Sequence, residues 1–409
     1  MSNDKKPDIR FKDYSDDWEQ RKVSGIGNIV TGSTPKTSVS DNYGGEFLFV
    51  SPVDIQENRY VDETITTLTK KGFDQGRKIR EKASLFVSIG STIGKVAQIN
   101  QESTTNQQIN AVEPYDNFDD DFIFTSLENI SGSIKAIASN QAVPIVNKTT
   151  FGETEIQVPL ELGEQQKIGQ YFVNLDHLIT LHQRKYDKLQ NLKKAMLEKM
   201  FPKNGSNVPE IRFKEFTDDW EQRKLGDIAS SFEYGLNAAA KEYDGENKYI
   251  RITDIDDNTH EFLTDNLTSP DIELTGADNY KLTEGDILFA RTGASVGKSY
   301  IYKNSDGLVY YAGFLIRARI KEEYDTEFVF QNTLTDRYNK YIAVTSQRSG
   351  QPGVNAQEYA EFEIKVPKKE EQTKIGTYFR NIDNLITLHQ RKCNQLQIIR
   401  KYMLKNMFL

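Results

Sequence analysis

Apolar residues recur in steps of four and three between residues 164 and 201, and the pattern returns between 371 and 408. Such steps over five heptads without an interior proline predict long helices with a coiled-coil seam. The predicted seam of the first helix is Ile168, Phe172, Leu175, Ile179, His182, Tyr186, Leu189, Lys193, Met196 and Met200. That of the second is Ile375, Phe379, Ile382, Ile386, His389, Cys393, Leu396, Arg400, Met403 and Met407. We expect the two helices to bury these faces against each other.

The two helical stretches are copies of each other. With a constant offset of 207 and no gap, 24 of their 38 positions are identical. A second repeat joins residues 7–23 to residues 209–225, with 12 of 17 positions identical, and carries the only tryptophans, Trp18 and Trp220. The whole chain is therefore a tandem duplication of about 205 residues. Each tryptophan is interpreted as an anchor that docks its arm, and Ser15 and Thr217 are expected to cap a short helix there.

The segments between the repeated parts differ in sequence but share a texture. Short β-rich runs, at 47–50, 85–89, 287–290 and 309–316, stand among Gly, Pro, Ser and Thr turns, which predicts one compact α+β domain in each half. The run LFVSIGSTIGKV corresponds to LFARTGASVGKS about 203 residues later. A further correspondence joins Pro144, Val146 and Asn147 to Pro352, Val354 and Asn355.

Linker length favours one arrangement of these parts. The link from residue 201 to 209 spans at most ~27 Å, whereas each helix is a rod of roughly 57 Å. An antiparallel helix pair lets the short link suffice, so we expect two domains at opposite ends of a rod with a pseudo-twofold axis. The predicted fold is α+β, with β-rich domains at residues 1–163 and 202–370 and long helices at residues 164–201 and 371–409.

Composition narrows the class of protein. The 409 residues carry a net charge of −8, but acidic residues gather at 119–121 and 254–257 and basic ones at 70–82 and 291–319. Segregated charge leaves a nucleic-acid partner open, although a solvated face is the commoner meaning of a charged run. The single cysteine, Cys393, gives no disulfide framework and fits a reducing cytoplasm. No apolar run approaches the ~20 residues of a membrane span.

The sequence offers little catalytic chemistry. Two Gly-x-x-x-Gly-Lys segments begin at Gly90 and Gly293, but a phosphate-binding loop needs four residues between the glycines. A strand–turn–strand, or a backbone-and-lysine contact to DNA phosphate, remains for these segments. Four histidines and one cysteine show no metal-ligand spacing. His182 and His389 are expected to set the register of the seam.

The ordered repeats resemble the specificity subunits of type I restriction–modification systems. Each helix follows Val-Pro and then Glu-Gln-x-Lys-Ile, and each variable domain begins with Trp-Glu-Gln-Arg-Lys. The residues that carry the first pattern are Val158, Pro159, Glu164, Gln165, Lys167, Ile168, Val366, Pro367, Glu371, Gln372, Lys374 and Ile375. Gly32-Ser33-Thr34-Pro35, followed by Tyr43, Gly45 and Asp54-Ile55, is similar to the opening of that family's target recognition domains. Residues 230–240 lack the Gly-Ser-Thr-Pro sequence, so contacts from that loop are not carried into the second half.

The resemblance implies that each target recognition domain reads one half of an asymmetric, bipartite site in double-stranded DNA. The coiled coil would set the unread spacer and dock two modification (methyltransferase) subunits. Those subunits would bind S-adenosylmethionine, whereas restriction subunits would use ATP and Mg²⁺. The chain itself would be non-catalytic, hold no cofactor or metal, touch no membrane and act in the cytoplasm.

Base-reading side chains are expected to pair Arg with guanine and Asn or Gln with adenine, among more numerous phosphate contacts. The predicted DNA-contacting residues of the first domain are Thr34, Lys36, Arg77, Lys78, Arg80, Thr92 and Lys95. Those of the second domain are Arg291, Thr292, Lys298, Gln347, Arg348 and Gln351.

Two other functions remain open at this point. A coiled-coil adaptor that joins proteins without touching DNA would also suit duplicated helices. An enzyme that acts on DNA alone would have to transfer a methyl group or cleave as an isolated chain. Salt-dependent DNA binding separates the adaptor from a DNA-reading protein.

Overall fold

The computed structural model describes residues 6–138, 145–203, 205–348 and 350–409. The chain forms two compact units, Met1–Gln183 with Arg391–Leu409, and Arg184–Gln390. Each unit therefore contains part of both long helices, and the division passes through the helices rather than at their ends. Pro144, which the sequence comparison joined to Pro352, lies outside the described residues.

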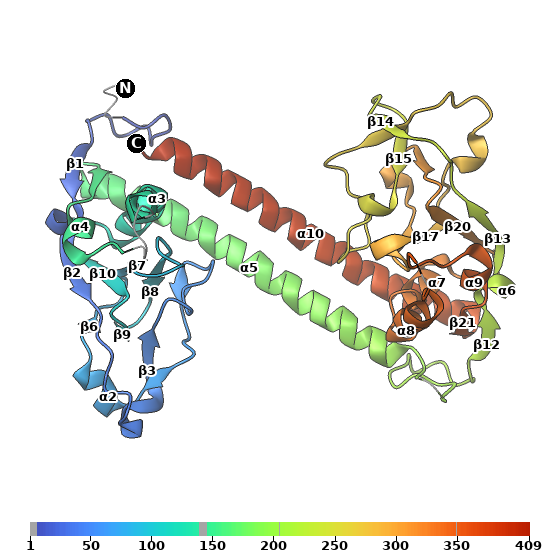
Figure 1. Ribbon diagram of the computed structural model, residues 1–409, viewed down its shortest axis with the longest axis horizontal. Helices are drawn as coiled ribbons and strands as arrows, with labels where there is room; N and C mark the ends of the chain where they lie inside the picture. The colour runs from blue at the N-terminus through green and yellow to red at the C-terminus, as the bar shows by residue number, and fades with distance from the viewer. Residues whose placement is uncertain (1–5, 139–144, 204, 349) are drawn as a thin grey trace. The chain divides into compact units, whose positions relative to one another are not determined.

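Two helices of 39 residues, α5 (Leu162–Met200) and α10 (Lys369–Met407), confirm the predicted helical stretches, although each begins two residues earlier and ends one or two residues earlier than predicted (Figure 1). Every predicted seam position in them is buried or half-buried. In the first unit the beginning of α5 meets the end of α10, where the rings of Phe172 and Phe408 lie 5.7 Å apart. In the second unit the end of α5 meets the beginning of α10, where Phe201 and Phe379 lie 5.9 Å apart. Within each unit the helices thus pack antiparallel.

Besides a two-stranded pair, the described residues of the first unit form two larger sheets. The larger one has the strand order β2-β10-β7-β8-β4, antiparallel from β2 to β8 and parallel between β8 and β4. The other has the order β5-β3-β9-β6, with β3 and β9 parallel. The strands are β2 (Gly27–Thr31), β3 (Tyr43–Val50), β4 (Tyr60–Val61), β5 (Thr67–Leu68), β6 (Lys78–Ile79), β7 (Ser84–Val87), β8 (Val96–Ile99), β9 (Ser103–Thr105) and β10 (Ile109–Pro114). The shorter helices are α1 (Val23–Ile26), η1 (Ser40–Asn42), α2 (Lys70–Gln75), α3 (Asp120–Ala138) and α4 (Lys148–Gly152).

The second unit repeats the antiparallel part of this plan as β13-β20-β17-β18. The parallel pair β15-β19 corresponds to β3-β9, and an antiparallel pair β14-β16 is added. The strands are β13 (Ala229–Tyr234), β14 (Ala240–Glu242), β15 (Lys248–Ile250), β16 (Thr268–Pro270), β17 (Ile287–Ala290), β18 (Ser299–Ile301), β19 (Val309–Tyr311) and β20 (Leu315–Ile320). The helices are α6 (Leu225–Ile228), η2 (Ile252–Asp254), η3 (Asp278–Tyr280), η4 (Gly293–Ser295), η5 (Asn304–Asp306), α7 (Thr326–Asn332), α8 (Asp336–Thr345) and α9 (Ala356–Ala360).

The predicted strand at 309–316 is interrupted. It divides into β19 and β20 because the amide of Leu315 closes a turn on the carbonyl of Ala312 (2.8 Å), and the amide of Gly313 donates to the carbonyl of Leu236 (2.8 Å). An apolar run hides such a turn, since both flanking strands are buried. The predicted α+β class with long antiparallel helices is nevertheless confirmed.

The repeated arms form strands rather than the short helices expected after Ser15 and Thr217. Each arm strand pairs antiparallel with the strand that precedes a long helix, with Glu19 opposite Val158 and Glu221 opposite Val366. A partner more than 130 residues away satisfies the backbone, so local helix capping does not decide the structure. The strand pairs are β1 (Glu19–Lys22) with β11 (Glu155–Val158), and β12 (Glu221–Lys224) with β21 (Glu363–Val366).

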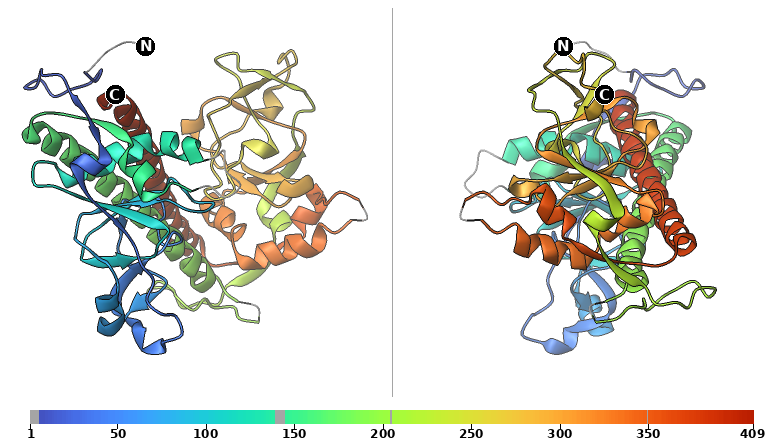
Figure 2. Two further views of the ribbon diagram at one scale, coloured as in Figure 1. Left: turned by 60° about the vertical axis from the view of Figure 1, so that its left-hand side comes forward. Right: turned by 90° about the vertical axis from the view of Figure 1, so that its right-hand side faces the viewer.

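The tryptophans anchor their arms, as predicted. Trp18 and Trp220 are each 2% exposed. Trp18 packs edge-on against Phe408, with ring centroids 6.1 Å apart, and Trp220 packs in the same way against Phe201 at 6.1 Å. In the first unit the amide of Ile9 also donates to the carbonyl of Asn406 (2.9 Å), and the described chain begins beside the end of α10 (Figure 2).

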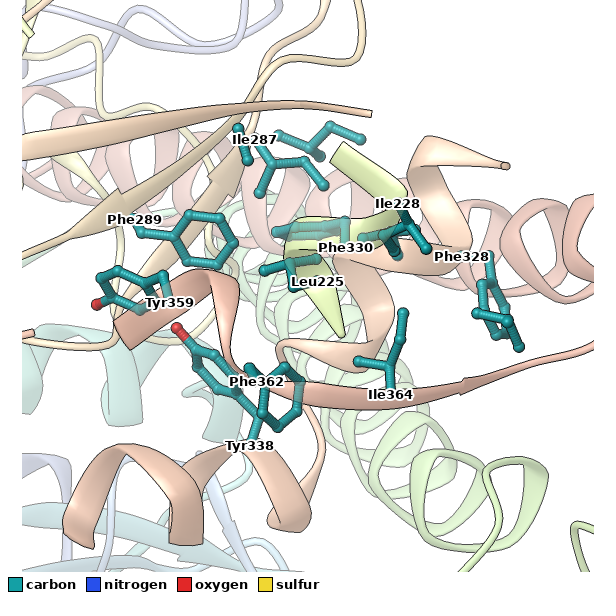
Figure 3. Close-up of a cluster of buried hydrophobic side chains, with 14 of the residues drawn as sticks. Leu225, Ile228, Ile287, Phe289, Phe328, Phe330, Tyr338, Tyr359, Phe362 and Ile364 are labelled. Atoms are coloured by element: carbon teal, nitrogen blue, oxygen red, sulfur yellow. The ribbon is translucent and has the colours of Figure 1, made fainter. Parts of the chain in front are cut away.

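The core of each unit joins the sheet to the long helices. In the second unit Phe289 and Tyr359 lie 4.7 Å apart, and Tyr338 meets Phe362 edge-on at 5.1 Å (Figure 3). The same cluster includes Phe201 and Phe379 from the helix ends. Among the described residues no helix is long and apolar enough to cross a membrane.

Candidate nucleic-acid interface

A glycine follows the first strand of the larger sheet in each domain: Gly32 follows β2, and Gly235 follows β13. A Cβ built on Gly32 would lie 2.2 Å from the carbonyl oxygen of Asn106, and one on Gly235 would lie 2.1 Å from that of Ala312. Only glycine permits so close an approach of two backbones. The second domain lacks the Gly-Ser-Thr-Pro sequence but keeps this glycine, so its loop makes the same approach with different side chains.

Polar side chains of the first domain gather around the loop after Gly32. The Thr34 hydroxyl donates to Oε1 of Gln107 (2.6 Å). The backbone amide of Arg77 donates to the hydroxyl of Ser33 (3.1 Å), and its guanidinium donates to the carbonyl of Thr31 (2.9 Å). Thr34, Arg77 and Gln107 are exposed. Two of the predicted DNA-contacting residues are therefore brought together here.

The turn between β7 and β8 continues this surface. A Cβ on Gly90, where the turn begins, would lie 3.7 Å from Nε2 of Gln108. Oε1 of Gln108 accepts a hydrogen bond from Nδ2 of the Asn106 side chain (3.0 Å). Thr92 lies in the same turn and is half-buried. We call the following residues the first loop edge: Thr34, Arg77, Thr92, Gln107 and Gln108.

Two other residues predicted to contact DNA in the first domain, Lys78 and Arg80, are paired with carboxylates. Nζ of Lys78 lies 2.9 Å from Asp74, and that hydrogen bond raises the pKa of Lys78. The guanidinium of Arg80 donates to both carboxylate oxygens of Asp120, at 3.0 and 2.5 Å, which raises the Arg80 pKa. Lys36 is exposed. Because Lys78 and Arg80 are paired with carboxylates, fewer of their N–H donors and less of their positive charge are available to a phosphate.

The lysines of the two Gly-x-x-x-Gly-Lys segments make the same contact in both units. Nζ of Lys95 donates to the carbonyl of Ile55 and Nζ of Lys298 to that of Ile255, each at 3.0 Å. The segments form the expected strand–turn–strand, between β7 and β8 and between β17 and β18. Each lysine ties this turn to a neighbouring loop, which is a structural task that the sequence did not indicate.

In the second domain Arg291 is the centre of the corresponding surface. Its guanidinium carbon lies 4.9 Å from the ring centroid of Tyr234, and its Nη1 lies 3.5 Å from the carbonyl of Gly313. Its backbone amide donates to the carbonyl of Phe314 (3.0 Å). Phe314 is 60% exposed. An arginine that lies over the ring of Tyr234 is thus presented beside the turn that carries Phe314.

The neighbouring loop adds polar groups to the same surface. Thr292 forms a β-bridge with Gly353, and a Cβ on Gly293 would lie 3.0 Å from Nε2 of Gln351. Asn237 is exposed in the loop after Gly235. We call the following residues the second loop edge: Tyr234, Asn237, Arg291, Thr292, Phe314 and Gln351.

The remaining predicted residues lie beside rather than on this edge. The guanidinium of Arg348 donates to Glu358 and to the carbonyl of Thr345 (2.8 Å). Gln347 is exposed in the same loop. Lys298 is paired with Asp257 at 2.5 Å in addition to its backbone contact. The sequence did not single out Gln107, Gln108, Tyr234, Asn237 or Phe314, because their proximity depends on the glycine loops.

Buried charge fastens the first domain to the helices of its unit. Asp176 of α5 accepts from Arg59 (3.0 Å), whose side chain is 2% exposed, and from Arg400 of α10. Arg400 also donates to Glu128 of α3 (2.6 Å). Burial opposes the charge of Arg400, yet the hydrogen bonds to Glu128 and Asp176 raise its pKa.

The second unit holds a related cluster. Lys193 of α5 lies 2.6 Å from Asp383 of α10, and Gln331 of α7 donates to the same carboxylate (2.9 Å). His260 packs edge-on against Phe330, where Arg59 covers Phe124 in the first unit. These clusters join each domain to the long helices of its unit and contain no residue of the loop edges. Among the described ranges no three or more His, Cys, Asp or Glu side chains gather to hold a metal ion.

Both halves of the duplicated chain match a known protein family. The family described as the type I restriction modification DNA specificity domain matches residues 15–191 and 217–397. The chain is 28% identical over 245 residues to the type I restriction enzyme MjaIX specificity subunit of Methanocaldococcus jannaschii, covering 57% of this chain and about half, 56%, of that relative. It is 22% identical over 397 residues to the MjaVIII specificity subunit of the same organism, covering 94% of this chain and 91% of the relative.

The fold is also similar to a solved structure. The type I restriction–modification S subunit from M. genitalium matches with a TM-score of 0.67 at 15% identity, over 99% of both chains. At this identity the likeness concerns the fold alone. The family match covers both halves of the duplication, each with its domain and most of its long helix. The chain therefore belongs to the family of type I restriction–modification DNA specificity domains.

Proposed function

We propose that this chain selects the DNA sequence for a type I restriction–modification complex, with each unit reading one half of a bipartite, asymmetric site. One observation carries the proposal. The two domains share the order of their four antiparallel strands and the close approach of Gly32 and Gly235, yet they present different side chains at the two loop edges. A common frame with unlike contact groups is what two readers of unlike half-sites require.

The loop edges carry the chemistry for base reading. Glutamine pairs with adenine and arginine with guanine through bidentate hydrogen bonds in the major groove. Gln107 and Arg77 on the first edge and Arg291 and Gln351 on the second offer these groups. Thr34, Thr92 and Thr292 would add single hydrogen bonds. The exposed Lys36 would contact phosphate.

We assign a supporting role to Lys95 and Lys298, because each holds the carbonyl of a neighbouring loop. The carboxylate pairing of Lys78, Arg80 and Arg348 likewise favours loop positioning over direct contact. These five residues would affect DNA binding through the loops they hold.

The long helices would set the number of unread base pairs and dock two modification subunits. Apolar side chains are exposed at equivalent places on both helices: Leu178 (41%) and Leu181 (38%) on α5, and Leu385 (44%) and Leu388 (49%) on α10. Exposed apolar residues at matched positions suit a partner that binds twice in the same way. The seam residues would keep the helices paired.

In this proposal the chemistry belongs to the partners. Modification subunits would supply S-adenosylmethionine, and restriction subunits would supply ATP and Mg²⁺ sites. The chain itself would contribute no catalytic group.

The test is DNA selection by the chain together with its modification subunits. A randomised duplex library should yield two unlike conserved blocks with a fixed gap. The affinity for that duplex should fall steeply with salt, because phosphate contacts release counterions, with a slope of about −0.9 per contact. Arg77→Ala and Arg291→Ala should each weaken one block.

A protein adaptor predicts a different outcome. It would show no selected sequence and no salt-dependent DNA affinity while still binding the modification subunits. Methyl transfer or cleavage by the chain alone would favour a self-sufficient DNA enzyme.

A further inference from the structure

Phe314 stands on a turn whose backbone is fixed on all sides. The amide of Leu315 closes the turn on the carbonyl of Ala312 (2.8 Å), and the amide of Gly313 donates to Leu236 in the loop after Gly235 (2.8 Å). The carbonyl of Phe314 accepts from the amide of Arg291 (3.0 Å). The side chain is therefore presented from a rigid base.

The side chain itself is turned to solvent. Phe314 is 60% exposed, whereas its neighbours Leu315 and Ala312 are 0% and 6% exposed. A single exposed apolar residue is ordinary on a protein surface. Here, however, the backbone of Phe314 is bonded to that of Arg291, whose guanidinium lies over Tyr234 and near the Gly313 carbonyl. The ring is thus part of a surface built to present side chains.

The first domain has a different residue at this place. The carbonyl of Gln108 accepts from the amide of Ser88 (2.8 Å), just as the carbonyl of Phe314 accepts from that of Arg291. Gln108 is half-buried, and its side chain is bonded to Asn106. The same position on the frame thus presents an amide in one domain and an aromatic ring in the other.

We propose that Phe314 contacts the 5-methyl group of a thymine in the half-site that the second unit reads. The inference rests on the proposed function. A phenyl ring has no hydrogen-bonding group, and the thymine methyl is the apolar feature that base edges display in the major groove. Arg291, whose backbone amide donates to the carbonyl of Phe314, would bind the phosphate or a neighbouring guanine and so hold this turn against the groove.

The test removes one methyl group at a time from the DNA. In the site selected by the chain with its modification subunits, each thymine is replaced by deoxyuridine, which differs only in lacking that methyl. At one position of the second half-site, wild type should bind about fourfold more weakly, the effect of exposing one methyl group. Phe314→Ala should bind the thymine site about as weakly as wild type binds the uracil site, and should not distinguish the two.

Two further variants complete the design. Phe314→Leu keeps an apolar side chain and should retain part of the preference for thymine. Gln108→Ala, at the matched position of the first domain, should leave the preference in the second half-site unchanged. Because Phe314 is exposed, its variants should unfold at the wild-type temperature, which checks that the loss is one of contact.

Several results would overturn the inference. A second half-site without thymine, wild-type indifference to every deoxyuridine, or a Phe314→Ala protein that still prefers thymine would each do so. Failure of the complex to select any DNA sequence would instead overturn the proposed function, so the two failures are distinguishable.

Discussion

Arg10 and Glu164 face each other through two hydrogen bonds, Nε to Oε1 at 2.6 Å and Nη2 to Oε2 at 2.8 Å. The side chains are 11% and 2% exposed. Arg212 and Glu371 repeat the arrangement in the second unit at 2.7 and 2.8 Å. The hydrogen bonds to these glutamates raise the pKa of both arginines. In each unit an arm residue is thus fastened to the first turn of a long helix.

Breaking one of these pairs should destabilise one unit. Glu164→Gln keeps the shape of the side chain but leaves the Arg10 guanidinium buried without its charge partner, which we expect to cost ~3 kcal/mol. Urea unfolding followed by Trp18 fluorescence, in a Trp220→Phe background, measures the first unit. Replacing both partners, as in Arg10→Met with Glu164→Leu, should cost less than the single change. Equal stability of Glu164→Gln and wild type would contradict a stabilising role of the Arg10–Glu164 pair.

The second unit should lose stability in mild acid through His260. Nδ1 of His260 lies 3.0 Å from the carbonyl of Ser299, and burial lowers its pKa from 6.5. The folded state therefore binds this proton less readily than the unfolded chain. The stabilisation is complete above about pH 6.5 and is lost as the pH falls toward the lower folded pKa. Among the nearby charges, Lys193 and Lys298 lower the pKa of His260 further, whereas Asp383 raises it.

His260→Asn isolates this effect. The backbone φ of His260 is 57°, a conformation that asparagine tolerates better than most residues. The variant should show a flatter pH dependence of unfolding between about pH 5.5 and 7 than wild type. Burial raises the pKa of Glu327, and its opposite contribution is common to both proteins. Identical slopes would contradict a lowered pKa of His260 in the folded state.

The loop after Gly32 should tolerate no side chain. Gly32→Ala places a methyl group 2.2 Å from the Asn106 carbonyl, so the loop that carries Thr34 must move. We expect Gly32→Ala to bind DNA that contains the complete site roughly tenfold more weakly than wild type, a loss of ~1.4 kcal/mol. Gly25→Ala is the matched control, because a Cβ at Gly25 would meet no atom of another part of the chain within 4 Å. This variant should bind DNA as wild type does. If both variants bind alike, the loop does not position a reader.

Lengthening the long helices should change only the spacer. Four residues inserted after Gln183 and after Gln390 add ~6 Å to each helix, or about two base pairs of DNA. Seven residues add ~10.5 Å, or about three base pairs, and also keep the heptad register of the seam. Sites selected from a randomised duplex library should keep both half-sites in each case. An unchanged spacer in both proteins would remove the role of the helices as a ruler.

Local periodicity predicted the long helices well. The seam from Ile168 to Met200 depends on neighbours three and four residues away, so the sequence determines it without knowledge of the fold. Pairing between distant segments was predicted less well. The arm after Ser15 forms a strand because it pairs with Glu155–Val158. This partner lies far along the chain, so the local sequence gives no sign of the pairing. The turn at Gly313 was hidden between two buried apolar runs.

The candidate site divides in the same way. Thr34 and Arg291 could be proposed from residue type and resemblance. The proximity of Gln107 to Thr34 depends on the close approach at Gly32, and the sequence gives no sign of it. Lys95 was selected for its charge, but a carbonyl more than 30 residues earlier, that of Ile55, takes its donor. Long-range backbone geometry decides which polar groups share a surface.

Exchange of the first domain is the most direct test of the central claim, that each unit reads its own half-site. The ends of this domain are adjacent, because Lys22 pairs with Glu155 and Glu19 with Val158, so residues 24–160 can be replaced by the equivalent segment of a relative. In cells carrying the complete system, sequencing of methylated sites should show one half of the site changed, with the other half and the spacer retained. A change in both halves, or in neither, would contradict the account.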